Sequence, residues 1–68
     1  QKAISDYNQA IDLNPDDADA YYNKGLIFED RGDTNTARIN FERAAELYQQ
    51  QGNEEGYRNA MEKLEELD

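Results

Sequence analysis

The residues that could carry chemistry in this 68-residue chain are almost all carboxylates, because 16 aspartates and glutamates stand against 7 lysines and arginines. Two carboxylates can act as a general acid and base when a buried pocket separates their pKa values. None of these acids lies in a sequence context that marks a buried pocket, so we interpret them as solvated surface. Histidine and cysteine are absent and Ser5 is the only serine, which excludes the usual pairs of nucleophile and base. We therefore expect no catalytic residues and no enzyme activity.

One short pattern resembles a metal site. Asp12, Asn14 and Asp16 alternate like the start of a calcium-binding loop. Pro15 interrupts this pattern, and the loop lacks the glycine at its sixth place and the glutamate at its twelfth. Zinc is excluded because its usual histidine and cysteine ligands are absent, and the glycines do not have the spacing of a phosphate-binding loop. The sequence therefore predicts neither a metal nor a cofactor.

The charge of the chain restricts its partners. A formal net charge of -9 repels phosphate backbones and anionic lipid surfaces, so we expect neither nucleic-acid binding nor membrane insertion. No apolar run approaches the ~18 residues of a membrane-spanning helix. The absence of cysteine fits a reducing compartment, which favours a cytoplasmic location. The chain begins with Gln1 rather than Met, so a targeting signal upstream would not be seen here.

The elements that must position any site are helices. Valine is absent, β-branched residues are few, and good helix formers are plentiful. Asn14–Pro15, Gly32 and Gly52–Asn53 interrupt the apolar periodicity. Four helices are predicted. The first covers about 2–13, and the second runs from a cap at Asp16 or Asp17 to about Arg31. The third covers about 35–50 after a cap at Asp33 or Thr34, and the fourth runs from Glu54 to about Leu67.

The sequence repeats itself with a period of 34 residues. Sliding the chain by this distance places Ala3 on Ala37, Tyr7 on Phe41, Ala10 on Ala44, Asp12 on Glu46 and Leu13 on Leu47. The first and third predicted helices are therefore two copies of one element. A period of about 34 residues built from helix, turn and helix is typical of the tetratricopeptide repeat, and the chain resembles that family over most of its length.

The resemblance implies an all-α fold, in which antiparallel helix-turn-helix repeats form a right-handed α-solenoid of four helices. It divides the chain into the second helix and closing proline of a truncated repeat (1–15), one full repeat (16–51) and a C-terminal capping helix (52–68). Lys24 stands where the family often has leucine, and Gln49 where it has proline. The positions that match the family's pattern are Ala3, Tyr7, Ala10 and Pro15, followed by Tyr21, Gly25, Phe28, Gly32, Ala37, Phe41 and Ala44.

These matching residues are explained by packing. Gly25 and Ala37 allow two helices to approach closely, and Tyr21, Phe28 and Phe41 fill the space around that contact. We therefore assign them to the scaffold and not to a ligand.

The resemblance also implies a binding groove, because the first helix of each repeat lines the concave surface that takes a peptide. Asn23 matches an asparagine of the family's carboxylate clamp, but the lysines and arginines of that clamp are missing. A basic or mixed apolar-basic peptide fits better, with Tyr22 and Leu26 as its anchor. The alternative is that the acids are a solvated face and that Tyr22 packs on an adjacent helix. The peptide-binding candidates are Asp19, Tyr22, Asn23, Leu26, Glu29 and Asp30.

The fourth predicted helix differs from the others, because one apolar stripe faces a polar remainder. Such a helix can cover the end of a repeat stack, and the preceding "QQQ" displaces it from strict repeat register. We interpret it as a C-terminal cap, with a partner-binding amphipathic helix as the alternative. The stripe consists of Tyr57, Ala60, Met61, Leu64 and Leu67.

At the other end, helix 2–13 lacks the first half of its repeat, which leaves a face with Ile4, Tyr7 and Ile11 uncovered. The chain is then a fragment of a longer array, or a protein that self-associates through this face. The sequence predicts a protein-interaction scaffold that binds a peptide or helix segment in its groove. The alternative is a purely structural C-terminal capping fragment of a longer array, which self-associates through its exposed N-terminal helix.

Overall fold

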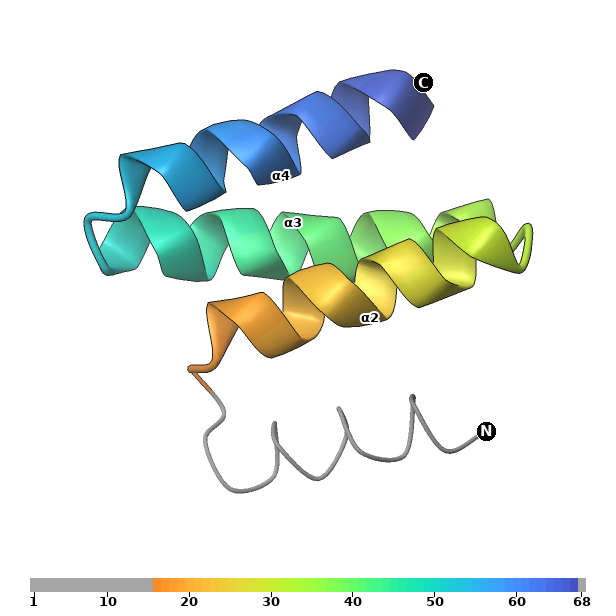
Figure 1. Cartoon of the computed structure of the whole chain (residues 1–68), viewed down its shortest axis with the longest axis horizontal. Helices are drawn as coiled ribbons and strands as arrows, with labels where there is room; N and C mark the ends of the chain where they lie inside the picture. Colours follow the sequence, from red (N-terminus) through yellow and green to blue (C-terminus); the bar gives the residue numbers. More distant parts are fainter. Residues whose placement is uncertain (1–15, 68) are drawn as a thin grey trace.

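A computed structural model of the chain describes residues 16–67. This part contains three α-helices and no strand: α2 covers Ala18–Asp30, α3 covers Thr34–Gln50 and α4 covers Glu54–Leu67. Figure 1 shows α3 between the other two, with each helix antiparallel to the one before it. The all-α fold and these three of the four predicted helices are confirmed. Helix 2–13, Pro15 and the uncovered face of that helix lie outside the described residues.

Each helix begins at a side chain that accepts a hydrogen bond from a free amide of the first turn. The N–H of Ala20 donates to Oδ1 of Asp17 (3.1 Å), and the N–H of Thr36 donates to Oδ1 of Asp33 (3.2 Å). Of the predicted alternatives, Asp17 rather than Asp16 caps α2, and Asp33 rather than Thr34 caps α3. Thr34 is the first residue of α3. The third cap is Asn53, whose Oδ1 accepts from the N–H of Gly56 (2.9 Å).

Two glycines end the first two of these helices. Gly32 has φ of 83° and Gly52 has φ of 73°, which is the left-handed region where a side chain is unfavourable. After Gly32 the chain turns back, so that the N–H of Asp33 donates to the carbonyl of Phe28 (2.9 Å). The helix break predicted at Gly32 is confirmed, and α2 ends at Asp30 with Arg31 as its C-terminal cap.

The core is centred on α3, the helix that packs against both neighbours. Ala37, Phe41 and Ala44 have no exposed surface, and Leu47 is 1% exposed. Ala37, Phe41 and Ala44, which match the repeat pattern, therefore form the buried seam of this helix. Tyr21 and Phe28, the two aromatic residues of α2 that were expected to pack around this seam, are only half-buried.

Gly25 is the small residue that brings α2 onto this seam. A Cβ atom at Gly25 would lie 2.7 Å from Cε1 and 2.8 Å from Cδ1 of Phe41. The ring of Phe41, rather than the backbone near Ala37, is therefore the neighbour that requires glycine at this position.

The fourth helix packs on α3 through a second close approach. A Cβ at Gly56 would lie 2.5 Å from Cδ1 of Tyr48, and Ala60 is fully buried. Tyr57 is half-buried, as are Leu64 and Leu67. Met61 differs from the predicted stripe, because 42% of its surface is exposed. The residues of α4 that lie closest to α3 are Gly56 and Ala60. With these two residues facing α3, the orientation of α4 about its axis turns Met61 toward solvent.

Within residues 16–67, no helix is both long and apolar enough to cross a membrane.

Candidate peptide-binding surface

The six predicted binding residues lie on one side of α2. At about 100° per residue, positions 19, 22, 23, 26, 29 and 30 fall within an arc of about 120°. Asp19 and Asp30 are exposed, and the four residues between them are half-buried. The helix therefore presents two apolar side chains, Tyr22 and Leu26, between acidic residues at either end.

Tyr22 contributes to the core as well as to this surface. Its ring meets Phe41 edge to face, with centroids 5.5 Å apart and an angle of 61°, and it meets Tyr48 at 6.5 Å and 63°. Such pairs stabilise packing by about 0.5–1.5 kcal/mol beyond the area they bury. The packing of Tyr22 on an adjacent helix, one of the two alternatives for this residue, is thus present. Leu26, the other apolar candidate, has no ring and takes no part in these aromatic contacts.

An ion pair connects α2 to α4 across this surface. Nζ of Lys63 lies 3.8 Å from Oε1 of Glu29 and 3.6 Å from Oε1 of Glu66. The Lys63 side chain is 27% exposed and that of Glu29 is 30% exposed, so water weakens this attraction. Glu29 nevertheless has a cation close to it, unlike the acid at the other end of the helix.

That other end borders a polar hollow of about 280 Å³ between α2 and α4. All three helices contribute to its walls, because α3 ends next to the first turns of the other two. The six residues that line this polar hollow are Asp19, Tyr48, Asn53, Glu55, Gly56 and Asn59.

Tyr48 connects the three helices at this hollow. Its ring packs against Gly56 of α4, and its hydroxyl donates a hydrogen bond to Oδ1 of Asp19 on α2. Tyr48 is 5% exposed. Burial, and then the hydrogen bond to the Asp19 carboxylate and its negative charge, raise the pKa of Tyr48 far above its usual range. The hydroxyl therefore stays protonated and serves as a fixed donor.

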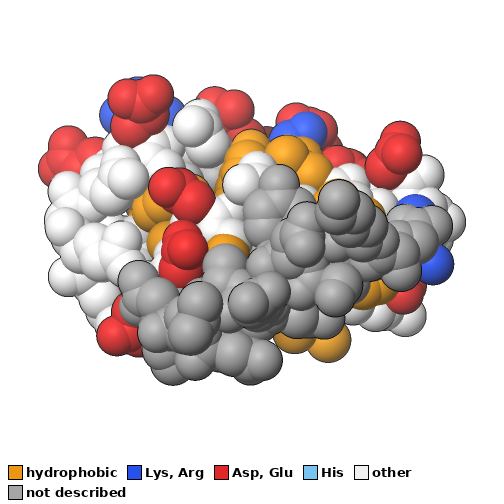
Figure 2. Space-filling model, turned by 60° about the horizontal axis from the view of Figure 1, so that its bottom comes forward, with side chains coloured by type: hydrophobic (Ala, Val, Ile, Leu, Met, Phe, Trp, Pro, Cys, Tyr) orange, Lys and Arg blue, Asp and Glu red, His pale blue; other side chains and the backbone are white. Residues whose placement is uncertain are grey.

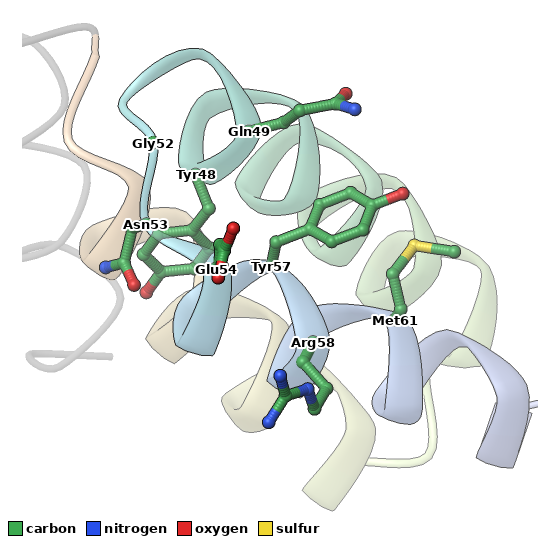
Figure 3. Close-up of a pocket in the computed structure, with 8 residues that line it drawn as sticks. All are labelled: Tyr48, Gln49, Gly52, Asn53, Glu54, Tyr57, Arg58 and Met61. Atoms are coloured by element: carbon green, nitrogen blue, oxygen red, sulfur yellow. The ribbon is translucent and has the colours of Figure 1, made fainter.

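A second hollow, of about 520 Å³, lies between the end of α3 and the start of α4. Figure 3 shows Tyr57 and Met61 extending to the same side of α4, whereas Arg58 points away from them. The exposed thioether of Met61 and the half-buried ring of Tyr57 make part of this hollow apolar. None of the six predicted binding residues lines it.

Acidic side chains predominate on the described surface (Figure 2). Figure 2 shows acidic side chains spread over the described part of the face it displays, with few basic ones among them. Opposite charges on a partner would speed its approach and suppress acidic competitors. Among the described residues, no group of three histidines, cysteines or acids is arranged to hold a metal ion.

Sequence reasoning missed the residues that α3 and α4 contribute to this surface. No role at this surface was predicted for Tyr48 of α3, or for Glu55, Asn59 and Lys63 of α4. One signal could have found them. Because tight turns at Gly32 and Gly52 reverse the chain twice, α4 runs in the same direction as α2, and their first turns lie toward the same end of α3 (Figure 1), where both border the polar hollow.

The described residues thus define an α-helical repeat protein, in which one helix-turn-helix unit is followed by a further helix packed on it. Comparison with family models agrees. A model described as TPR repeat matches residues 1–32, and one described as tetratricopeptide repeat matches residues 18–51. The chain belongs to the tetratricopeptide repeat family. No curated protein and no solved structure matches it. Repeats of this family generally mediate interactions between proteins.

Proposed function

We propose that this chain is a protein-interaction scaffold that binds a basic or mixed apolar-basic peptide, or a helix segment, along α2. The binding residues are Asp19, Tyr22, Asn23, Leu26, Glu29 and Asp30, extended by the side of α4 that faces them. The observation that carries the proposal is the polar hollow at one end of this surface, next to half-buried apolar side chains. A peptide could place an apolar side chain on Leu26 and a cation at the hollow.

The charges of the surface favour this partner class. Lys63 of α4, which lies 3.8 Å from the candidate Glu29, is held between Glu29 and Glu66. A peptide carboxylate would therefore meet mainly acids, whereas a lysine or arginine would meet complementary charge. The apolar anchor supplies affinity through buried area, at about 25 cal/mol per Å² removed from water.

The test is a peptide array probed with the labelled chain and with two variants. Linear peptides of varied composition are expected to be retained when they combine lysine or arginine with a large apolar residue. Leu26→Gln should abolish retention, since it puts an amide where the anchor packs. Tyr22 is a poor site for this test, because its ring also packs on Phe41 and its truncation would disturb the core.

The matched control is Ile39→Gln. Ile39 is 65% exposed on α3, and it is neither a predicted binding residue nor part of the polar hollow. This variant replaces an aliphatic side chain of the same size as leucine with the same amide, but on another surface. Equal retention by Leu26→Gln and wild type, with circular dichroism showing both folded, would contradict the proposal, as would the absence of any retained peptide.

A second candidate function is a structural end piece of a longer array, and the packing of α4 favours it. This helix buries Gly56 and Ala60 against α3 and exposes an acidic outer face. In this alternative the chain self-associates through residues 2–13. Sedimentation over a concentration series tests it: an oligomer that loses helix on dilution would support self-association, and a stable helical monomer would contradict it. The exposed acids of α4 are Glu54, Glu55, Glu62, Glu65 and Glu66.

A further inference from the structure

We propose that Tyr48 is a specificity-determining residue of the α2 surface, because its hydroxyl holds the Asp19 carboxylate at the wall of the polar hollow, where a lysine or arginine side chain of the bound peptide is recognised. This inference rests on the proposed function and assigns to one end of the surface the recognition of a cation. Tyr48 acts through Asp19 and is therefore a positioning residue.

The position of Tyr48 is fixed by packing. Its ring lies against Gly56, where even a Cβ atom would come within 2.5 Å of Cδ1 and 2.6 Å of Cε1. The same ring also meets Tyr22 of α2 edge to face, with centroids 6.5 Å apart. A ring held between two helices in this way cannot change rotamer without separating them. The hydroxyl that it carries is consequently presented at one place.

That hydroxyl fixes an otherwise mobile acid. Asp19 is exposed in the first turn of α2, and a free carboxylate there would sample several rotamers. Its Oδ1 accepts the hydrogen bond from Tyr48, and both residues line the polar hollow. A carboxylate has about four lone-pair sites, so one bond from a neutral hydroxyl leaves room for bonds from an ammonium or guanidinium group. Tyr48 therefore orients the charge of Asp19 without neutralising it.

The two acidic ends of the α2 surface differ for this reason. At the far end, Lys63 lies 3.8 Å from Glu29 and already supplies a cation. At the near end, the only partner of the Asp19 side chain within residues 16–67 is the uncharged Tyr48. Glu55 lines the same hollow and forms no ion pair with any described residue. A cation of the partner is expected at Asp19 rather than at Glu29.

The helix N-termini at this end do not reverse the preference. Each N-terminus carries the equivalent of about half a positive charge, which favours anions. The first turns of α2 and α4 carry Asp19, Glu54 and Glu55, each with a full negative charge, and Asp17 caps α2. The sum at the hollow is negative.

The test uses the tightest lysine-containing peptide from the array and the same peptide with norleucine in place of that lysine. Norleucine keeps the apolar stem and removes the charge. Fluorescence anisotropy gives the affinity of both peptides for wild type and for Tyr48→Phe, which keeps the ring against Gly56. In wild type the Asp19 side chain is already ordered before the peptide binds, whereas in Tyr48→Phe the binding of the lysine must order it. We therefore expect Tyr48→Phe to lower the ratio of lysine to norleucine affinity about three- to tenfold.

A second variant separates positioning from structure. Asp19→Asn keeps an acceptor for Tyr48 but removes the charge, so it should lower the same ratio, and Tyr48→Phe should add little to it. A merely structural role for Tyr48 would weaken both peptides equally and leave the ratio unchanged, which would overturn this inference while the proposed function stands. Peptide retention that is absent, or insensitive to Leu26→Gln, would remove the proposed function and this inference with it.

Discussion

Gly25 of α2 lies directly against the ring of Phe41 of α3, so closely that a Cβ atom at position 25 would come 2.7 Å from Cε1. Phe41 has no exposed surface, and its ring cannot retreat without opening the core. This contact fixes the distance between the two helices of the repeat. It also holds in place the side of α2 that carries the candidate binding residues, because Tyr22 packs on the same ring.

We predict that Gly25→Ala destabilises the chain. Overpacking costs about 1–3 kcal/mol, whereas alanine in place of glycine inside a helix gains at most about 1 kcal/mol. The free energy of unfolding in urea, followed by circular dichroism, should therefore fall. The control is the same change in a Phe41→Leu background, where the smaller side chain leaves room and the loss should shrink. A net gain near 1 kcal/mol in Gly25→Ala would show that the helices separate freely.

Adjacent positions on α4 provide a second prediction. Ala60 is fully buried and Met61 is 42% exposed, although the sequence placed both on one stripe. Ala60→Leu should lower the free energy of unfolding by about 1–3 kcal/mol, because the larger side chain has no space against α3. Met61→Gln should change it by less than about 0.5 kcal/mol, as surface substitutions usually do. Urea unfolding checks both, and a large loss in Met61→Gln would mean that another surface covers this residue.

The helices and their caps could be predicted because their signals are local. Asp17, Asp33 and Gly32 act within one turn of their own positions, and the resemblance to the tetratricopeptide repeat implied the seam of Ala37, Phe41 and Ala44. The buried seam follows from the family's pattern, since each repeat needs small and large residues in alternation where its helices cross.

The arrangement at the polar hollow could not be predicted in the same way. It depends on where the end of α3 and the start of α4 lie relative to α2, and on the rotation of α4 about its axis. Gly56, which was not singled out, sets that rotation by its contact with Tyr48. A hydrogen bond between Tyr48 and Asp19, 29 residues apart, carries no local signal. The six candidate residues of α2 were found as one face, but their neighbours were not.

The raised pKa of Tyr48 predicts a loss of stability in alkali. Below about pH 10, the usual value for tyrosine, the hydroxyl is protonated in folded and unfolded chains, and its bond to Asp19 stabilises the fold fully. Above that pH the unfolded chain releases the proton and the folded chain keeps it. The free energy of unfolding should then fall by up to about 1.4 kcal/mol per pH unit.

Urea unfolding at pH 8, 9, 10 and 11 measures this effect, with Tyr48→Phe as the control. The phenylalanine variant keeps the ring but has no proton to lose, so its stability should decline less steeply above about pH 10. At pH 8 it should be less stable than wild type, since the hydrogen bond to a charged group is absent. Parallel curves for the two proteins across this range would contradict the protected hydroxyl.

The last prediction concerns Lys63, which lies beside the proposed binding residues and opposes a basic partner. Removing its charge in Lys63→Gln should strengthen the binding of the lysine-containing peptide. One unit charge at roughly 8 Å in water is worth about 0.5 kcal/mol, so we expect an increase of about two- to threefold at low salt. Screening should reduce this gain at physiological ionic strength. Arg43→Gln is the matched control, because it changes the net charge equally.

The control is informative because of where Arg43 lies. Its guanidinium is 5.9 Å from the ring centre of Tyr21 and pairs with Glu46 at 2.7 Å, and it belongs neither to the six candidates nor to the polar hollow. If peptide binding responds only to the net charge of the chain, the two variants gain equally. If the peptide lies between α2 and α4, Lys63→Gln gains more, because its charge is the nearer one. Equal gains in anisotropy titrations would therefore move the binding surface away from Glu29 and Lys63.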